Sequence, residues 1–190
     1  MVWIRLALLA GVFGAGCLAP ERLLAQQLTI CHGYSCHFKT PLALGSGDMK
    51  RIEAIMRAGQ ASAASERRAV SILVQFYERR ATAAIGIKDR AKSDFGAGRE
   101  RGQMDCVDES TNTTSILKFV GARGLLKHHK VLRTASRGFF ADGRYPHFTA
   151  VLRDHAGNGW AVDSWFEPAG GPPDIMPLEK WKSRGVRGRR

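Results

Sequence analysis

Residues 102–110 read Gly102-Gln103-Met104-Asp105-Cys106-Val107-Asp108-Glu109-Ser110, and they put one cysteine where a helix is expected to begin. Asp105 or Asp108 can cap the free N–H groups of the first turn, and Ser, Thr and Asn residues follow. The positive end of a helix dipole favours a thiolate over a thiol. The stretch therefore predicts a helix from about Asp105 to Val120 with a nucleophilic cysteine at its start.

Two further side chains suited to thiol chemistry lie downstream, on two predicted strands. His147 belongs to the strand 147–154 and Asp163 to the strand 160–166, with a turn expected near residues 156–159 because Asn-Gly favours a hairpin. In such a set, Cys106 attacks an amide or ester carbonyl, His147 carries the proton and Asp163 orients the imidazole. Backbone N–H groups at the helix start, with the Gln103 amide, would hold the oxyanion.

The geometry of this hairpin decides whether His147 and Asp163 can meet. A two-residue turn at Asn158-Gly159 would set Asp163 opposite Asp154, roughly 23 Å along the strand from His147. A wider loop near residues 153–158, a bulge or a strong twist would bring the two side chains together. Each residue also has a plain structural alternative: a histidine bonded to backbone, an aspartate that caps a turn, and a cysteine packed in the core.

These motifs resemble the transglutaminase-like cysteine peptidase superfamily, particularly the bacterial transglutaminase-like cysteine proteinases. The resemblance covers about residues 100–167 and rests on Asp105-Cys106-Val107-Asp108, on His147 with Ala150-Val151-Leu152, and on Gly159-Trp160-Ala161-Val162-Asp163. It implies an α+β, papain-like fold in which the N-terminal helices and a Cys-bearing helix pack on a small antiparallel sheet. It also implies Cys106 as nucleophile, His147 as base and Asp163 as orienter. The polar run Glu109-Ser110-Thr111-Asn112 departs from the family pattern.

The N-terminal 25 residues predict a signal peptide rather than part of the fold. Arg5 precedes an apolar run of 13 residues, 6–18, which is too short to span a bilayer comfortably. Gly14-Ala15-Gly16-Cys17 faintly resembles a lipoprotein box, so lipidation at Cys17 is a secondary possibility. We expect an exported protein, periplasmic or secreted, with one domain over residues 26–182 and a disordered basic tail over 183–190.

An exported chain would keep three cysteines in an oxidising compartment. Cys31 and Cys36 are five positions apart and can form a local disulfide, which leaves Cys106 as an odd thiol. Two alternatives use Cys31, Cys36 and the neighbouring His37 as a haem-attachment or metal site, although the spacing fits neither well. We expect the disulfide, and no metal or cofactor.

The remaining elements follow from apolar periodicity and turn residues. Two helices are predicted over 48–61 and 65–84, the second started by Ser65, and both have apolar faces typical of core packing. Residues 26–46 predict an irregular entry segment, and 125–132 a strand on which His128 and His129 face opposite sides. Pro177-Leu178-Glu179-Lys180-Trp181, in a Pro-rich tail, is expected to dock back on the domain.

Composition limits the partners. The net charge is +12, or +11 without residues 1–25, which carry Arg5, Arg22 and Glu21. No aromatic-interleaved nucleic-acid motif is present, so no nucleic-acid partner is expected, and membrane contact is expected only through the signal peptide. The chain predicts a thiol hydrolase or acyltransferase acting on a protein, a cell-wall peptide or a small amide. The alternative is a catalytically idle basic domain that binds an acidic surface partner.

Overall fold

The computed structural model describes residues 26–93, 99–138 and 146–184. The predicted signal peptide, Cys17 and the tail residues 185–190 lie outside this range. The described elements, in chain order, are β1 (Gln26–His32), β2 (Phe38–Leu44), α1 (Ser46–Ala58), α2 (Ala63–Ile85), α3 (Cys106–Ala122), β3 (His129–Val131), β4 (Ala135–Arg137), β5 (His147–Asp154), β6 (Gly159–Asp163), β7 (Asp174–Pro177) and α4 (Leu178–Ser183).

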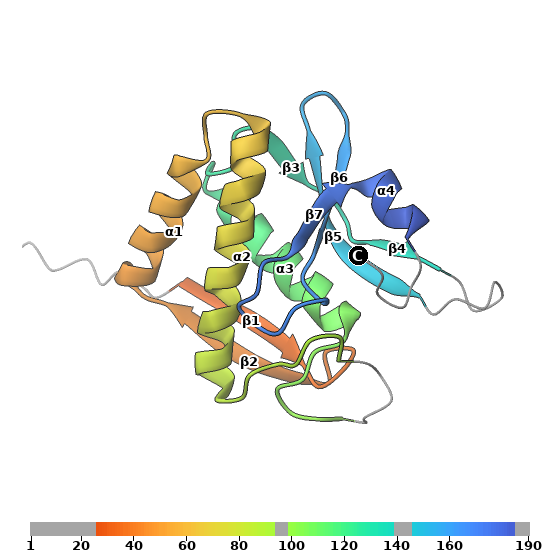
Figure 1. Ribbon diagram of the computed structural model, residues 1–190. Coiled ribbons are helices and arrows are strands. Elements are labelled where there is room, and N and C mark those ends of the chain that lie inside the picture. The colour runs from red at the N-terminus through yellow and green to blue at the C-terminus, as the bar shows by residue number, and fades with distance from the viewer. Residues whose placement is uncertain (1–25, 94–98, 139–145, 185–190) are drawn as a thin grey trace, which may run out of the picture.

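The architecture is α+β, with α3 in the middle. Figure 1 shows α1 and α2 side by side on one flank and the antiparallel sheet on the other, with α3 between them and the β1–β2 hairpin at one end. The sheet has the order β3-β5-β6-β7, and β4 also pairs with β5. Ile116, Leu117 and Val120 of α3 lie in the core with side chains from α2 and β5. The central helix is thus held from several directions, and so is the residue at its start.

The N-terminal segment corrects one prediction. Residues 26–46, expected to be irregular, contain an antiparallel hairpin that runs from the Gln26–Leu44 pair to the His32–Phe38 pair. Ile30, Leu42 and Leu44 are buried at alternate positions, as strands require. The turn that joins the strands carries the Cys31–Cys36 disulfide, which confirms the predicted pairing.

The two predicted N-terminal helices are present, with boundaries that differ by a few residues. α1 begins two residues before Asp48, whose carboxylate accepts the Gly45 N–H. α2 is capped by Ser62, whose hydroxyl accepts the Ser65 N–H, and it ends at left-handed Gly86. The cap was predicted at Ser65, three residues too late, because several Ser and Ala residues there offer competing starts.

The C-terminal elements complete the sheet. The predicted strand 125–132 shortens to β3, and β4 and β7 were not predicted, because strands this short take their form from their partners. Residues 178–183 form α4 and dock on β6 and β7 with Trp181 fully buried, as expected. Ser183 ends this helix and Arg184 pairs with Asp174 at 3.1 Å, so the folded part extends past residue 182. None of the helices in the described ranges is long and apolar enough to cross a membrane.

Candidate active site

The start of α3 is built as the sequence predicts. Asp105 has an extended backbone and is the N-cap, and its carboxylate accepts the N–H groups of Val107 and Asp108 at 3.0 and 2.9 Å. Cys106 is therefore the first helical residue, where backbone N–H groups lie free of helical partners. Its side chain is 7% exposed.

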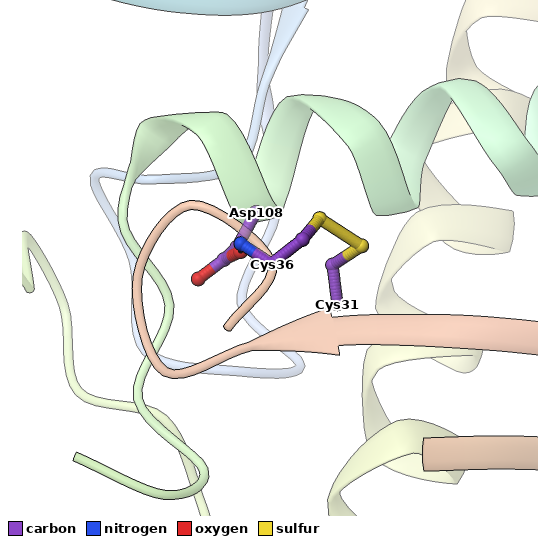
Figure 2. Close-up of side chains that lie close together, drawn as sticks. All are labelled: Cys31, Cys36 and Asp108. Atoms are coloured by element: carbon purple, nitrogen blue, oxygen red, sulfur yellow. A yellow bond between two sulfur atoms is a disulfide. The ribbon is translucent and has the colours of Figure 1, made fainter. Parts of the chain in front are cut away.

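The turn between β1 and β2 binds this helix start from the side. Tyr34 and Cys36 donate their backbone N–H groups to Asp108 at 2.8 and 2.5 Å, and Ser35 donates its own to Asp105 at 3.0 Å. These three donors come from consecutive residues with φ between 52° and 67°, a left-handed turn that brings its N–H groups to one side. The disulfide closes this turn, as Figure 2 shows.

The same turn holds a cluster with the composition of a metal site. The sulfur atoms of Cys31 and Cys36 and a carboxylate oxygen of Asp108 lie within 4.8 Å of one another. Both sulfur atoms are consumed by the disulfide, and Asp108 accepts two backbone N–H groups. Cysteine binds a metal as a thiolate and not as a disulfide. The contacts described here therefore hold the turn against the start of α3.

The β5–β6 hairpin brings His147 and Asp163 together. Its turn lies at residues 155–157, earlier in the chain than Asn158-Gly159: the Asp154 N–H donates to the Asn158 carbonyl, and the Asp154 carboxylate accepts from Asn158 and from the Trp160 indole. Ala150 therefore pairs with Val162, which sets Asp163 two residues from His147 along β5 rather than opposite Asp154. His147 Nε2 lies 2.8 Å from Asp163 Oδ2, and both side chains are buried.

The Cys106 sulfur lies beside the backbone on both sides of His147. It is 3.9 Å from the Pro146 carbonyl oxygen, and it also receives the backbone N–H of Phe148. The structure thus brings all three predicted residues into one region, from three elements: the start of α3, the start of β5 and the end of β6.

The thiol differs from the sequence expectation in one respect. Burial, the largest cause, and the charges of Asp105 and Asp163 together raise the pKa of Cys106 to about 12, against the lowering effect of the Phe148 N–H. The helix start alone suggested a thiolate, but desolvation outweighs it here. Any chemistry at this sulfur must begin from a thiol and needs a base within reach.

Aromatic side chains enclose the imidazole. The ring centroids of Trp165, Phe166 and Trp181 lie 4.9, 5.6 and 5.8 Å from that of His147. Trp181 also donates its indole N–H to Asp163 Oδ2 at 2.7 Å, and the Trp165 backbone N–H reaches Oδ1 at 3.4 Å. Together they shield the His–Asp pair from water.

Gln103 does not have the contacts of an oxyanion donor. Its amide nitrogen donates to the Lys88 carbonyl at 3.2 Å, and its oxygen accepts from the Arg90 N–H and the Ser93 hydroxyl. The side chain is buried and holds the segment 88–93. The oxyanion role predicted for Gln103 is therefore replaced by a structural one.

The polar run that departs from the family pattern is buried and bonded. Asn112 pairs its amide with both the N–H and the carbonyl of Cys31 at 2.8 Å, as a neighbouring strand would. Glu109 accepts the Ser164 hydroxyl at 2.7 Å and shares a hydrogen bond with Asp89. These polar groups fix α3 to β1 and to the segment after Asp163, and the long sequence separations hid them from sequence analysis.

Comparisons with known proteins add no relative. No family model, no curated protein and no solved structure matches the chain.

Proposed function

We propose that the protein is an exported thiol hydrolase or acyltransferase that acts on amide bonds, with a papain-like, transglutaminase-like arrangement of its α3 helix and sheet. The observation that carries the proposal is the 2.8 Å contact between His147 and Asp163 beside the sulfur of the only free cysteine in the described residues. Asp163 occupies Nε2, so the proposed base is the other ring nitrogen, Nδ1.

In the first half of the proposed reaction, the Cys106 sulfur attacks the carbonyl carbon while His147 takes the thiol proton. Asp163 stabilises the imidazolium, and the backbone N–H of Cys106 binds the oxyanion, since Asp105 already accepts those of Val107 and Asp108. The carbon–nitrogen bond then breaks, the proton passes from His147 to the leaving amine, and a thioester remains. Water, or an acceptor amine, loses a proton to His147, attacks the thioester and releases the thiol.

The high pKa of Cys106 fits this order of events. A thiol with a pKa of about 12 is protonated at neutral pH, so proton removal and attack must be concerted with the base. The base has to lie next to the sulfur, and the backbone contacts on both sides of His147 support that position.

Alkylation tests the proposal directly. Cys106, His147 and Asp163 are only 7%, 2% and 2% exposed, so labelling of the native protein would show that a reagent can reach the sulfur. Iodoacetamide is expected to label Cys106 in the native protein within minutes, identified by peptide mass spectrometry, and Cys106→Ala is expected to abolish turnover of peptide amides. Lys130→Ala, at an exposed position of β3, is the control. Labelling only after denaturation would rule out a catalytic thiol.

A second candidate function rests on the surface charge. An open groove of ≈ 420 Å³ is lined by Arg79, Lys88 and residues 168–171, with no acidic residue among the lining side chains. Two cations that line one groove favour an acidic polymer of the cell surface. Binding to lipopolysaccharide that weakens with salt and survives Cys106→Ala would support a binding domain in place of an enzyme.

A further inference from the structure

Arg137 is a buried cation in the wall of the candidate active site. It lies on β4 directly across from His147 on β5, so the two side chains share a face of the sheet. Its exposed fraction is 4%. The guanidinium stacks on Trp181, 4.4 Å from the ring centroid, and Nη1 donates to the Trp181 carbonyl. Trp181 in turn donates to Asp163, so arginine, tryptophan and the His–Asp pair form one packed unit.

Within the described part of the chain, two of the guanidinium nitrogens have no hydrogen-bond partner. Nε and Nη2 of Arg137 are buried and unbonded. The two acidic groups nearest in charge interaction are committed elsewhere, since Asp163 holds His147 and Trp181, and Asp174 holds Arg184 at 3.1 Å. Two buried guanidinium donors without hydrogen bonds are costly, so a ligand that accepts from both would be favoured here.

The electrostatics place this guanidinium within range of the reacting groups. Burial lowers the pKa of Arg137, the charges of Asp163 and Asp174 raise it, and that of Arg184 lowers it. An arginine that interacts with the orienting carboxylate and pairs with His147 across the sheet belongs to the same site as they do.

We propose that Arg137 binds a carboxylate of the substrate and thereby selects acyl groups that carry one close to the scissile amide. Nε and Nη2 project from the same edge of the guanidinium and are spaced to meet the two oxygens of one carboxylate. Nη1 is fixed by the Trp181 carbonyl and the plane by the Trp181 ring, so this edge is preorganised. A single buried arginine balances the single charge of a carboxylate, whereas a phosphate dianion needs more donors. This inference rests on the proposed function.

Matched electrophiles test the selection on the native full-length protein. One arm compares acyl-peptide chloromethyl ketones that differ only as Asp against Asn, or Glu against Gln, beside the ketone. The other arm compares iodoacetate with iodoacetamide, normalised to the same ratio on the unfolded chain. The rate of Cys106 alkylation is followed by mass spectrometry. The carboxylate member is expected to react about 10- to 100-fold faster, as a charge-assisted hydrogen bond allows.

Three variants identify the residue. Arg137→Gln is expected to abolish the preference, and Arg137→Lys, which keeps the charge and loses the two-pronged edge, is expected to lose most of it. Arg153→Gln, at an exposed position on the same strand as His147, is expected to keep it. If only the ketone pair shows the preference, Arg137 binds a side-chain carboxylate of the substrate. If only iodoacetate shows it, Arg137 binds a terminal carboxylate.

Two results overturn the inference in distinguishable ways. Equal rates for charged and neutral probes, with Cys106 alkylated by both, would refute carboxylate binding and leave the thiol chemistry intact. If no probe alkylates the native protein, the proposed function fails and the selection fails with it.

Discussion

The molecule holds two buried histidine–carboxylate pairs with the same contact distance and different surroundings. His147 Nε2 lies 2.8 Å from Asp163, and His129 Nδ1 lies 2.8 Å from Glu66, all four side chains being nearly inaccessible. The second pair is saturated: Glu66 also accepts the N–H groups of Lys127 and His128, and Arg67 contacts His129 Nε2 at 3.2 Å.

The first pair lies near the Cys106 sulfur, which contacts the backbone of Pro146 and Phe148 on either side of His147. The contacts of Glu66 and His129 join the N-terminal end of α2 to β3, which is a structural task. The comparison teaches that a short His–carboxylate contact does not itself make a site. What distinguishes the His147 pair is the nearby free cysteine and the surrounding aromatic side chains.

The largest expected difference between the pairs is in thiol reactivity. His147→Gln is expected to slow alkylation of Cys106 by iodoacetamide at pH 7 by about 10²- to 10⁴-fold, because the base that removes the thiol proton is lost. His129→Gln is expected to change the rate less than twofold. The measurement is the pseudo-first-order alkylation rate of folded protein. Similar slowing in both variants would mean that the two histidines act only on stability.

When stability is measured, we expect the larger loss from the carboxylate of the second pair, Glu66, and the smaller loss from Asp163. In Glu66→Gln one amide N–H must face a backbone donor, because both carboxylate oxygens accept hydrogen bonds, and we expect a loss of about 2–3 kcal/mol. Asp163→Asn can keep its oxygen on His147 and Trp181 and sacrifice only the 3.4 Å contact to the Trp165 N–H, so about 1 kcal/mol or less is expected.

Urea unfolding and alkylation of the same two variants check this reversal. Asp163→Asn should lose thiol reactivity with its fold intact, since the amide no longer stabilises the imidazolium. Glu66→Gln should unfold at lower urea yet react normally while folded. The same ranking in both assays would remove the distinction between a catalytic and a structural pair.

The sequence predicted what depends on local pattern. A cap at Asp105 or Asp108, a cysteine at the helix start and the apolar faces of α1 and α2 all follow from residues within a turn or two of one another. The Asn-Gly signal predicts the hairpin but not its register, because the turn lies earlier, at residues 155–157, where Asp154 bonds to Asn158 and Trp160.

Contacts between distant segments escaped prediction. The turn at residues 33–36 looked irregular because its left-handed backbone is held by carboxylates about 70 residues away. The partners of Asp163 include Trp181, 18 residues on, and nothing near Arg137 in sequence indicates that it lies across from His147. Burial of Cys106, which reverses the expected direction of its pKa shift, is likewise a property of the whole fold.

The smallest expected effect extends the comparison to pH. Burial would raise the pKa of Glu66, but the hydrogen bonds from His129, Lys127 and His128 lower it, so this carboxylate stabilises the fold at neutral pH and that contribution is lost on acidification through its folded value. Glu78 behaves in reverse: burial raises its pKa to about 8, with the Asp89 charge adding to this and the Gly170 N–H and Arg79 opposing it. Between about pH 4.5 and 8 the folded chain keeps a proton at Glu78 that the unfolded chain releases, so this group costs up to about 1.4 kcal/mol per pH unit as the pH rises.

Urea unfolding from pH 5 to 8 measures this effect. Glu78→Gln mimics the protonated acid, so its stability advantage over the parent protein should grow as the pH rises. The stability deficit of Glu66→Gln should shrink only as the pH falls below 5. Parallel stability curves for the parent and Glu78→Gln would show that Glu78 is ionised in the folded state, as Glu66 is.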